Sequence, residues 1–175
     1  MNELALQRAK AVRLMIFDVD GILTDGRLYF SAQGEELKAF NILDGHGLKM
    51  LRDSGVETAI LTARKSAIVE RRAQELGIAN VRQGVTDKLA GFLELLEHCK
   101  CTAPEAGYAG DDLVDLPVLT RCGFAASVPN AMAVVKSRAH LVTRANGGHG
   151  AVREMCEFIM NAQGTLDAAM APYLE

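Results

Sequence analysis

The sequence predicts an α/β domain in which helices flank a parallel β-sheet. Several short, continuous apolar runs occur along the chain, and such runs are typical of strands buried on both faces. From residue 44 onward these runs alternate with stretches in which apolar residues recur at the helical period. Alternation of this kind favours a layered domain with a parallel sheet. A chain of 175 residues is long enough to form one such domain with a substantial core.

The composition is that of an ordinary globular protein, with 49% hydrophobic and 23% charged residues. A net charge of -3 provides no basic surface for nucleic acid or for a polybasic contact with a membrane. No apolar run reaches membrane-spanning length, and residues 1–10 lack the apolar core of a signal peptide. Cys99-Lys100-Cys101 lacks a second ligand pair at zinc-like spacing, so we expect reduced thiols. We therefore expect a cytoplasmic protein that binds neither nucleic acid nor membrane.

The first buried strand is expected at residues 14–17, after a short amphipathic lead-in at 1–12. Three carboxylates follow this apolar run, at Asp18, Asp20 and Asp25, with glycines among them. Carboxylates clustered at the tip of a buried strand are costly unless a cation or hydrogen-bond donors compensate them. The pattern therefore indicates a site, although an acidic turn also accounts for it, because Asp and Gly favour turns.

Residues 27–41 predict a β-hairpin, because two short strand-like runs flank a loop that contains glycine. The hairpin has too few apolar residues to form a core of its own. Its aromatic residues Tyr29, Phe30 and Phe40 would be exposed unless they pack against a partner. The hairpin is therefore expected to take part in an interface.

The rest of the chain is expected to alternate regularly between strands and helices. Strands are expected at 56–61, 78–82, 107–109, 124–128 and 140–143. Helices are expected at 47–54, between 66 and 77, from 86 or 87 onward, around 116–119, and after the glycines at 147–150. No linker or repeat divides the chain. We expect one domain over 1–175, with the hairpin at 27–41 and a glycine-rich loop, helix and tail at 147–175.

Several polar side chains follow an expected strand or open the next helix: Asp18, Asp20, Thr62, Lys88, Asp111 and Asp112. The carboxyl ends of parallel strands meet at one edge of the sheet, where sheets of this kind bind ligands. Taken alone, Thr62 could be a strand end, Lys88 a solvated lysine and Asp111 a helix cap. Their common edge favours a functional site instead.

Four short motifs resemble a known signature in content, order and spacing: Asp18-Val19-Asp20-Gly21, Leu61-Thr62, Asp87-Lys88 and Gly110-Asp111-Asp112-Leu113-Val114-Asp115. The signature is that of the haloacid dehalogenase-like phosphohydrolases. Further segments are similar to one subfamily, the 3-deoxy-D-manno-octulosonate 8-phosphate (KDO 8-phosphate) phosphatases: residues 18–26, 38–40, 44–49 and 147–154. The resemblance implies a three-layer, Rossmann-like α/β core that lacks a cap domain and carries the hairpin as an insertion.

The resemblance also implies Mg²⁺-dependent catalysis through an aspartyl-phosphate. Asp18 would be the nucleophile, and Asp20 would be the general acid and then the general base. Asp18, Asp111 and the backbone carbonyl of Asp20 would bind Mg²⁺, which offsets the repulsion between nucleophile and phosphate. Thr62 would hydrogen-bond a phosphate oxygen, and Lys88 would add positive charge at a helix N-terminus.

Six further residues are candidates for substrate binding or for supporting the catalytic groups: Thr24, Asp25, Ala63, Arg64, Asp112 and Asp115. Asp112 and Asp115 would orient Lys88 or a metal-bound water. Arg64 suits a substrate carboxylate, because guanidinium binds it in bidentate fashion, but a surface salt bridge explains it nearly as well. Ala63 stands where the family commonly has glycine, and its methyl group would crowd the phosphate pocket if this position needs a positive φ. We expect tuning of activity there and not inactivation.

The implied reaction is hydrolysis of KDO 8-phosphate to KDO and phosphate, a step of lipopolysaccharide biosynthesis. A site without a cap is open to water, and the resemblance implies a homotetramer in which a neighbouring subunit closes it. Two alternatives stay open: a phosphatase of a nine-carbon sugar-acid 9-phosphate, and a receiver-like phospho-acceptor or binding domain. Chain order argues against the receiver, because receivers carry their acidic pair at the first strand and the acceptor Asp on a later one.

Overall fold

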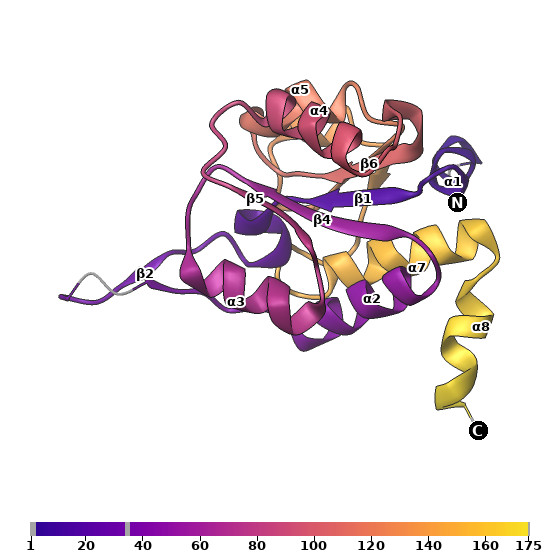
Figure 1. Cartoon of the computed structure of the whole chain (residues 1–175), viewed down its shortest axis with the longest axis horizontal. Helices are drawn as coiled ribbons and strands as arrows, with labels where there is room; N and C mark the ends of the chain where they lie inside the picture. The colour runs from indigo at the N-terminus through magenta and orange to yellow at the C-terminus, as the bar shows by residue number, and fades with distance from the viewer. Residues whose placement is uncertain (1–2, 34–35, 175) are drawn as a thin grey trace.

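A six-stranded parallel sheet forms the middle layer of the molecule (Figure 1). The computed structural model describes residues 3–33 and 36–174. The expected hairpin loop at Gly34 and Glu35 and the ends of the expected domain, residues 1, 2 and 175, lie outside the described residues. The strand order is β5-β4-β1-β6-β7-β8. The bounds are β1 (Leu14–Phe17), β4 (Glu57–Thr62), β5 (Asn80–Gln83), β6 (Ala106–Ala109), β7 (Phe124–Ser127) and β8 (Leu141–Val142).

Strand β1 is the centre of the core, and all four of its residues are buried. It pairs in parallel with β4 on one side and with β6 on the other, so that Phe17 lies opposite Ile60 and Ala109. A strand buried on both faces must be apolar throughout, which is why this run shows no alternation in the sequence. The carboxyl ends of β1, β4 and β6 consequently lie together at one edge of the sheet.

Helices form a layer on each face of the sheet, and the predicted α/β fold is confirmed. Figure 1 shows α2, α3 and α7 on one face and α4 and α5 on the other, while α1 packs against α7. The bounds are α1 (Glu3–Lys10), α2 (Ile42–Asp53), α3 (Ala67–Leu76), α4 (Lys88–His98), α5 (Leu116–Leu119), α6 (Ala133–Lys136), α7 (Ala151–Gln163) and α8 (Leu166–Met170). Within the described part of the chain, no helix has the length and apolar character needed to cross a membrane.

The helix expected at 47–54 begins earlier than the sequence indicated. It starts at Ile42 because the Asn41 side chain accepts a hydrogen bond from the backbone N–H of Leu43 at 2.8 Å, which caps the first turn. The short helices α6 and α8 carry too few residues to show a helical period in the sequence. These differences leave the sheet and its order unchanged.

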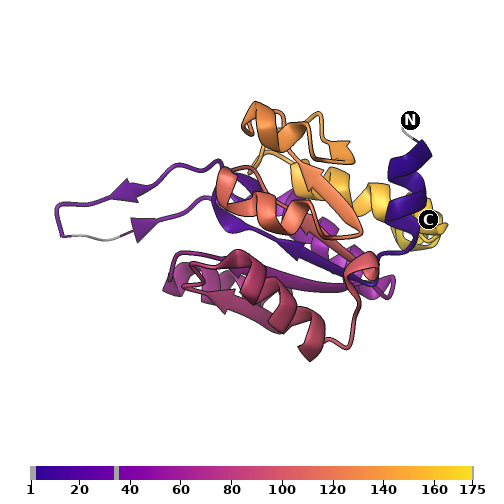
Figure 2. The ribbon, with the colours of Figure 1, turned by 90° about the horizontal axis from the view of Figure 1, so that it is seen from above.

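A two-stranded antiparallel hairpin projects beyond the sheet, as Figures 1 and 2 show. Its strands are β2 (Tyr29–Phe30) and β3 (Glu36–Leu37), with Tyr29 opposite Leu37. Tyr29 is 45% exposed, and Phe30 and Leu37 are each 64% exposed. The predicted β-hairpin insertion is therefore present, and it carries an apolar surface away from the core. Its return leg leads back to the carboxyl edge of the sheet.

Candidate active site

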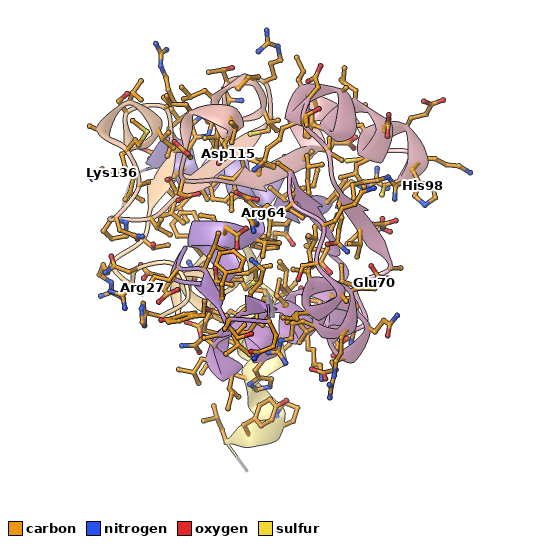
Figure 3. The ribbon with its side chains drawn as sticks, turned by 90° about the vertical axis from the view of Figure 1, so that its left-hand side faces the viewer. Arg27, Arg64, Glu70, His98, Asp115 and Lys136 are labelled. Carbon is orange, nitrogen blue, oxygen red and sulfur yellow. The ribbon has the colours of Figure 1, made fainter. Side chains whose placement is uncertain are left out.

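Most of the side chains singled out from the sequence line one cleft at the carboxyl edge of the sheet. The cleft has a volume of about 280 Å³. Its lining comprises Asp18, Asp20, Gly26, Thr62, Ala63, Arg64, Lys88, Asp111, Asp112 and Val114. The last residue of β4, the segments after β1, β4 and β6, and the first residue of α4 supply these groups, so residues far apart in sequence converge. Figure 3 faces this edge and shows Arg64 near its middle, with Asp115 close by.

Lys88 lies between two buried carboxylates. Its Nζ is 2.9 Å from Asp18 Oδ2 and 2.6 Å from Asp115 Oδ1. Asp115 also accepts a hydrogen bond from Tyr108 Oη at 2.6 Å and from two backbone N–H groups before the short helix η3 (Leu113–Asp115). Every oxygen of this carboxylate is engaged, so Asp115 fixes the position of Lys88.

Burial and crowding shift the pKa values of this cluster. Burial raises the pKa of Asp18 to about 6, although the nearby ammonium of Lys88 lowers it. Burial and then the charges of Asp18 and Asp115 raise the pKa of Asp111 to about 7. For Lys88, burial alone would lower the pKa, but the two adjacent carboxylates outweigh it and raise the pKa. Lys88 therefore stays charged, and the acidic cluster favours a further cation.

The acidic cluster fits a divalent cation. Carboxylate oxygens of Asp18, Asp111 and Asp115 lie within 4.8 Å of one another. Because Lys88, Tyr108 and two backbone N–H groups engage both oxygens of Asp115, Asp18 and Asp111 are the carboxylates suited to bind the cation. Asp111 Oδ1 is buried, with no hydrogen-bond partner among the described residues. In the turn η1 (Val19–Leu23), Gly21 has a φ of +94°, and a Cβ there would lie 2.0 Å from Asp111 Oδ2. Glycine thus gives the carboxylate its space, and these oxygens are the ligand type that Mg²⁺ prefers.

Two cations flank the Asp20 carboxylate. Lys38 Nζ donates a hydrogen bond to Asp20 Oδ1, and Arg64 Nε lies 3.7 Å from Asp20 Oδ2. Lys38 comes from the return leg of the hairpin, and its side chain is completely buried. Sequence reasoning assigned no role to Lys38, because 18 residues separate it from Asp20 and nothing local marks the contact. The single available signal was its place in the segment 38–40 that resembles the subfamily.

Thr24 and Asp25 lie outside the lining of the cleft and shape the turn beside it. Thr24 Oγ1 donates to the carbonyl of Val19 at 3.4 Å and accepts from the backbone N–H of Gly26 at 3.2 Å. Asp25 Oδ1 accepts from the backbone N–H of Arg27 at 3.0 Å. These hydrogen bonds hold the turn in the conformation that places Gly26 at the cleft. Thr24 and Asp25 therefore shape the cleft through the backbone of the turn.

Comparisons with known proteins agree with this geometry. A family model for haloacid dehalogenase-like hydrolases matches residues 78–155. The KDO 8-phosphate phosphatase of Yersinia pestis is 46% identical over 164 residues, covering 94% of this chain and 88% of the relative. Its counterpart in Escherichia coli K12 is 45% identical, with 94% and 87% covered. The chain belongs to the KDO 8-phosphate phosphatase branch of the haloacid dehalogenase-like hydrolases.

A solved structure from this family has the same fold as this chain. The KDO 8-phosphate phosphatase of Moraxella catarrhalis, in complex with magnesium ion, phosphate ion and KDO, has a TM-score of 0.96 to this chain. The two chains are 44% identical, and the match covers 99% of each. The predicted family resemblance and capless α/β fold are confirmed.

The structure accommodates Ala63, at the position where the family resemblance implies glycine. The cleft lining includes Ala63, and Ala63 is not among the described residues that have a positive φ. Its neighbour Thr62 is buried, and Thr62 Oγ1 accepts the backbone N–H of Arg64 at 3.4 Å. The methyl group therefore causes no backbone strain, and crowding of the bound phosphate is the remaining way in which it can act.

The glycine-rich loop at residues 147–150 braces the turn that carries the first motif. The backbone N–H of Gly148 donates to the carbonyl of Ile22 at 3.0 Å. A Cβ at Gly147 would lie 1.7 Å from the carbonyl oxygen of Gly21, so the two backbones touch. Buried Asp44 accepts backbone N–H groups at the start of α7, which fixes the other end of the loop.

Proposed function

We propose that this chain is a Mg²⁺-dependent phosphatase that hydrolyses KDO 8-phosphate to KDO and inorganic phosphate, in lipopolysaccharide biosynthesis. One observation carries the proposal. Asp18, in contact with the buried ammonium of Lys88, lines the same cleft as Asp20, which is two residues away and flanked by cations. A pair of carboxylates in such different surroundings suits one nucleophile and one acid–base group. The relatives named for this reaction are 44–46% identical over most of the chain.

The reaction divides into two displacements at phosphorus. In the first, a carboxylate oxygen of Asp18 bonds to phosphorus while the bond from phosphorus to the sugar oxygen breaks, and Asp20 gives that oxygen its proton. In the second, a water oxygen bonds to phosphorus and Asp20 takes the water proton. The bond between Asp18 and phosphorus breaks, so phosphate leaves and both carboxyl groups return to their starting states.

Other residues of the cleft bind and orient the phosphate. Thr62 donates its hydroxyl to a phosphate oxygen, and Lys88 provides a fixed positive charge because Asp115 holds it in place. Arg64, at the more exposed part of the cleft, binds the carboxylate of the sugar acid. When bound, Mg²⁺ would be held by Asp18, Asp111 and the backbone carbonyl of Asp20, and would neutralise charge between nucleophile and phosphate.

The proposal extends to the assembly and its location. The exposed aromatic hairpin supports a homotetramer in which a neighbouring subunit covers the open cleft. We place the chain in the cytoplasm, in keeping with four cysteines that form no disulfide in the described structure. We treat residues 1–175 as one domain, with the hairpin at 27–41 and the glycine-rich loop, helix and tail at 147–175.

The test is release of phosphate from KDO 8-phosphate by the purified chain with Mg²⁺, with a chelator, and after Asp18→Asn. We expect turnover with Mg²⁺, and a loss of at least about 10³-fold with the variant, because an amide cannot form the phosphoenzyme. A nine-carbon sugar-acid 9-phosphate serves as the competing substrate. Preference for the nine-carbon ester would support the phosphatase mechanism but reject KDO 8-phosphate as the substrate. Inertness toward every phosphate ester would reject the phosphatase and favour a binding domain.

A further inference from the structure

The hairpin delivers a buried cation to the site. Lys38 follows β3 directly, and its Nζ donates to Asp20 Oδ1. The Lys38 side chain is 0% exposed, whereas the strands β2 and β3 of the same hairpin expose Phe30 and Leu37 to solvent. Return of the hairpin to the sheet edge thus places one specific ammonium group against one specific carboxylate.

Stability of the fold does not by itself explain a lysine at this position. Withdrawing an ammonium from water is costly, and replacing a buried ion pair by apolar residues of similar size is often neutral or stabilising. Lys88 already neutralises Asp18 and is held by Asp115. Lys38 Nζ pairs with the carboxylate of Asp20. The two aspartates of the first motif thus contact lysines from different elements: Asp18 contacts Lys88 of α4, and Asp20 contacts Lys38 of the hairpin.

The geometry points to Lys38 as a positioning residue for Asp20, an inference that rests on the proposed phosphatase function. Its ammonium fixes Oδ1, while Arg64 lies on the side of Oδ2, so the carboxyl group has one preferred orientation. That orientation keeps the Asp20 carboxylate apart from the three clustered oxygens of Asp18, Asp111 and Asp115. Asp20 then faces the ester oxygen that receives its proton and, later, the attacking water.

Loss of Lys38 affects the two displacements differently, depending on the ester. A sugar alkoxide is a poor leaving group and needs the proton from Asp20 in the first displacement. A 4-nitrophenolate leaves without protonation, so its first displacement depends little on Asp20. The second displacement is the same for both esters, since water attacks the same phosphoenzyme and Asp20 takes its proton. A misdirected Asp20 therefore lets phosphoenzyme accumulate from the aryl ester alone.

The experiment compares Lys38→Met, Lys38→Arg and Arg27→Met with the wild-type chain. Arg27→Met is the matched control, because it removes an exposed cation from the outgoing leg of the same hairpin (Figure 3). For KDO 8-phosphate we expect Lys38→Met to lower kcat by about 10- to 100-fold with KM nearly unchanged, as for impaired acid–base catalysis. Lys38→Arg should recover most of the loss, and Arg27→Met should match wild type.

Rapid mixing with 4-nitrophenyl phosphate gives the decisive readout. We expect Lys38→Met to release a burst of about one nitrophenolate per active site before a slow steady rate. With KDO 8-phosphate, the same variant should release KDO without a burst. Two results would overturn the inference: a kcat within about twofold of wild type, or a loss that lies in KM for both esters. If Lys38→Met does not fold, Lys38→Arg becomes the test. A Lys38→Arg variant that has the wild-type thermal midpoint but a kcat far below that of wild type would also overturn the inference. If the wild-type chain does not hydrolyse KDO 8-phosphate, the proposed substrate is wrong. The burst with 4-nitrophenyl phosphate then still tests the role of Lys38.

Discussion

Replacing Lys88 by Met tests how strongly the buried charges of the cleft depend on one another. The Lys88 side chain is 2% exposed and contacts Asp18 at 2.9 Å and Asp115 at 2.6 Å. Methionine fills much the same space with no charge, so the substitution isolates the electrostatic contribution. Two adjacent carboxylates are then left in the interior without their shared cation.

The magnitude follows from the distances and from burial. At about 3 Å and an effective dielectric constant near 20, each contact is worth about 6 kcal/mol of attraction, which desolvation of the ammonium largely offsets. Breaking a buried pair by removing one partner costs about 3–5 kcal/mol. We expect a loss of that size in the free energy of unfolding at about pH 8 with metal chelated.

The loss should depend on pH in a defined direction. Lys88 lowers the pKa of Asp18, which burial nevertheless raises from 3.8 to about 6 in the folded chain. Without Lys88 the folded pKa rises further above the unfolded value. A raised folded pKa contributes stability below the unfolded pKa, and this is lost as the pH rises through the folded value. The deficit of Lys88→Met should therefore shrink toward about pH 5, by up to about 1.4 kcal/mol per pH unit.

Urea unfolding of wild type and variant at the two pH values is the assay. The matched control is Lys136→Met, because Lys136 Nζ donates to the carbonyl of Pro129 at 2.7 Å and not to a carboxylate. Its deficit should be small and independent of pH. A Lys88→Met deficit that is equal at both pH values would refute the electrostatic reasoning and assign the loss to packing.

Three further predictions concern the loop and the cation. Gly147→Ala should destabilise the chain by about 1–3 kcal/mol in urea unfolding, because its Cβ would lie 1.7 Å from the Gly21 carbonyl oxygen; unchanged stability would contradict the contact. Asp44→Ala leaves two partly buried backbone N–H groups without their acceptor and should cost about 2–4 kcal/mol, whereas Asp44→Asn, which keeps one acceptor oxygen, should cost less; equal losses would count against this hydrogen bonding. Since the pKa values of the ligands Asp111 and Asp18 are about 7 and about 6 without metal, the affinity for Mg²⁺ measured by calorimetry should rise roughly tenfold per pH unit between about pH 6 and pH 7, more steeply below about pH 6, and level off above about pH 7; a flat profile would exclude this coupling.

The sequence predicted the architecture well because burial leaves a strong local signal. A central strand such as β1 must be apolar at every position, and the helices beside it must show an apolar stripe. The start of α2 was harder to predict from the sequence, because it depends on the cap at Asn41. Two glycines early in the helix also lower its helix propensity. Local chemistry of this kind shifts an element boundary without changing the fold.

The site was predictable wherever its residues follow a strand, because topology then brings them together. Asp18, Thr62 and Asp111 needed the strand order and no side-chain detail. Lys38 was not predictable in this way, since it lies on an excursion from the sheet and its contact depends on where the hairpin returns. Thr24 was a candidate for substrate binding or for supporting the catalytic groups, and its hydroxyl forms hydrogen bonds with backbone groups of the turn. Roles in substrate binding stay predictions until the variants are measured.

The first motif has to give two identical side chains opposite tasks, and the surrounding chain explains how it can. Asp18 and Asp20 both have extended backbones, so residues two apart can point toward the same edge, and Gly21 then reverses the chain with a positive φ. The Asp18 side chain is 9% exposed against a lysine from α4, whereas that of Asp20 is 22% exposed against a lysine from the hairpin. In the proposed mechanism, burial and the fixed cation keep Asp18 oriented for attack at phosphorus, and partial exposure leaves Asp20 access to the ester oxygen and to water. The proposed division into nucleophile and acid–base group therefore depends on which distant element supplies each lysine, and on this proposal the hairpin is part of the catalytic apparatus.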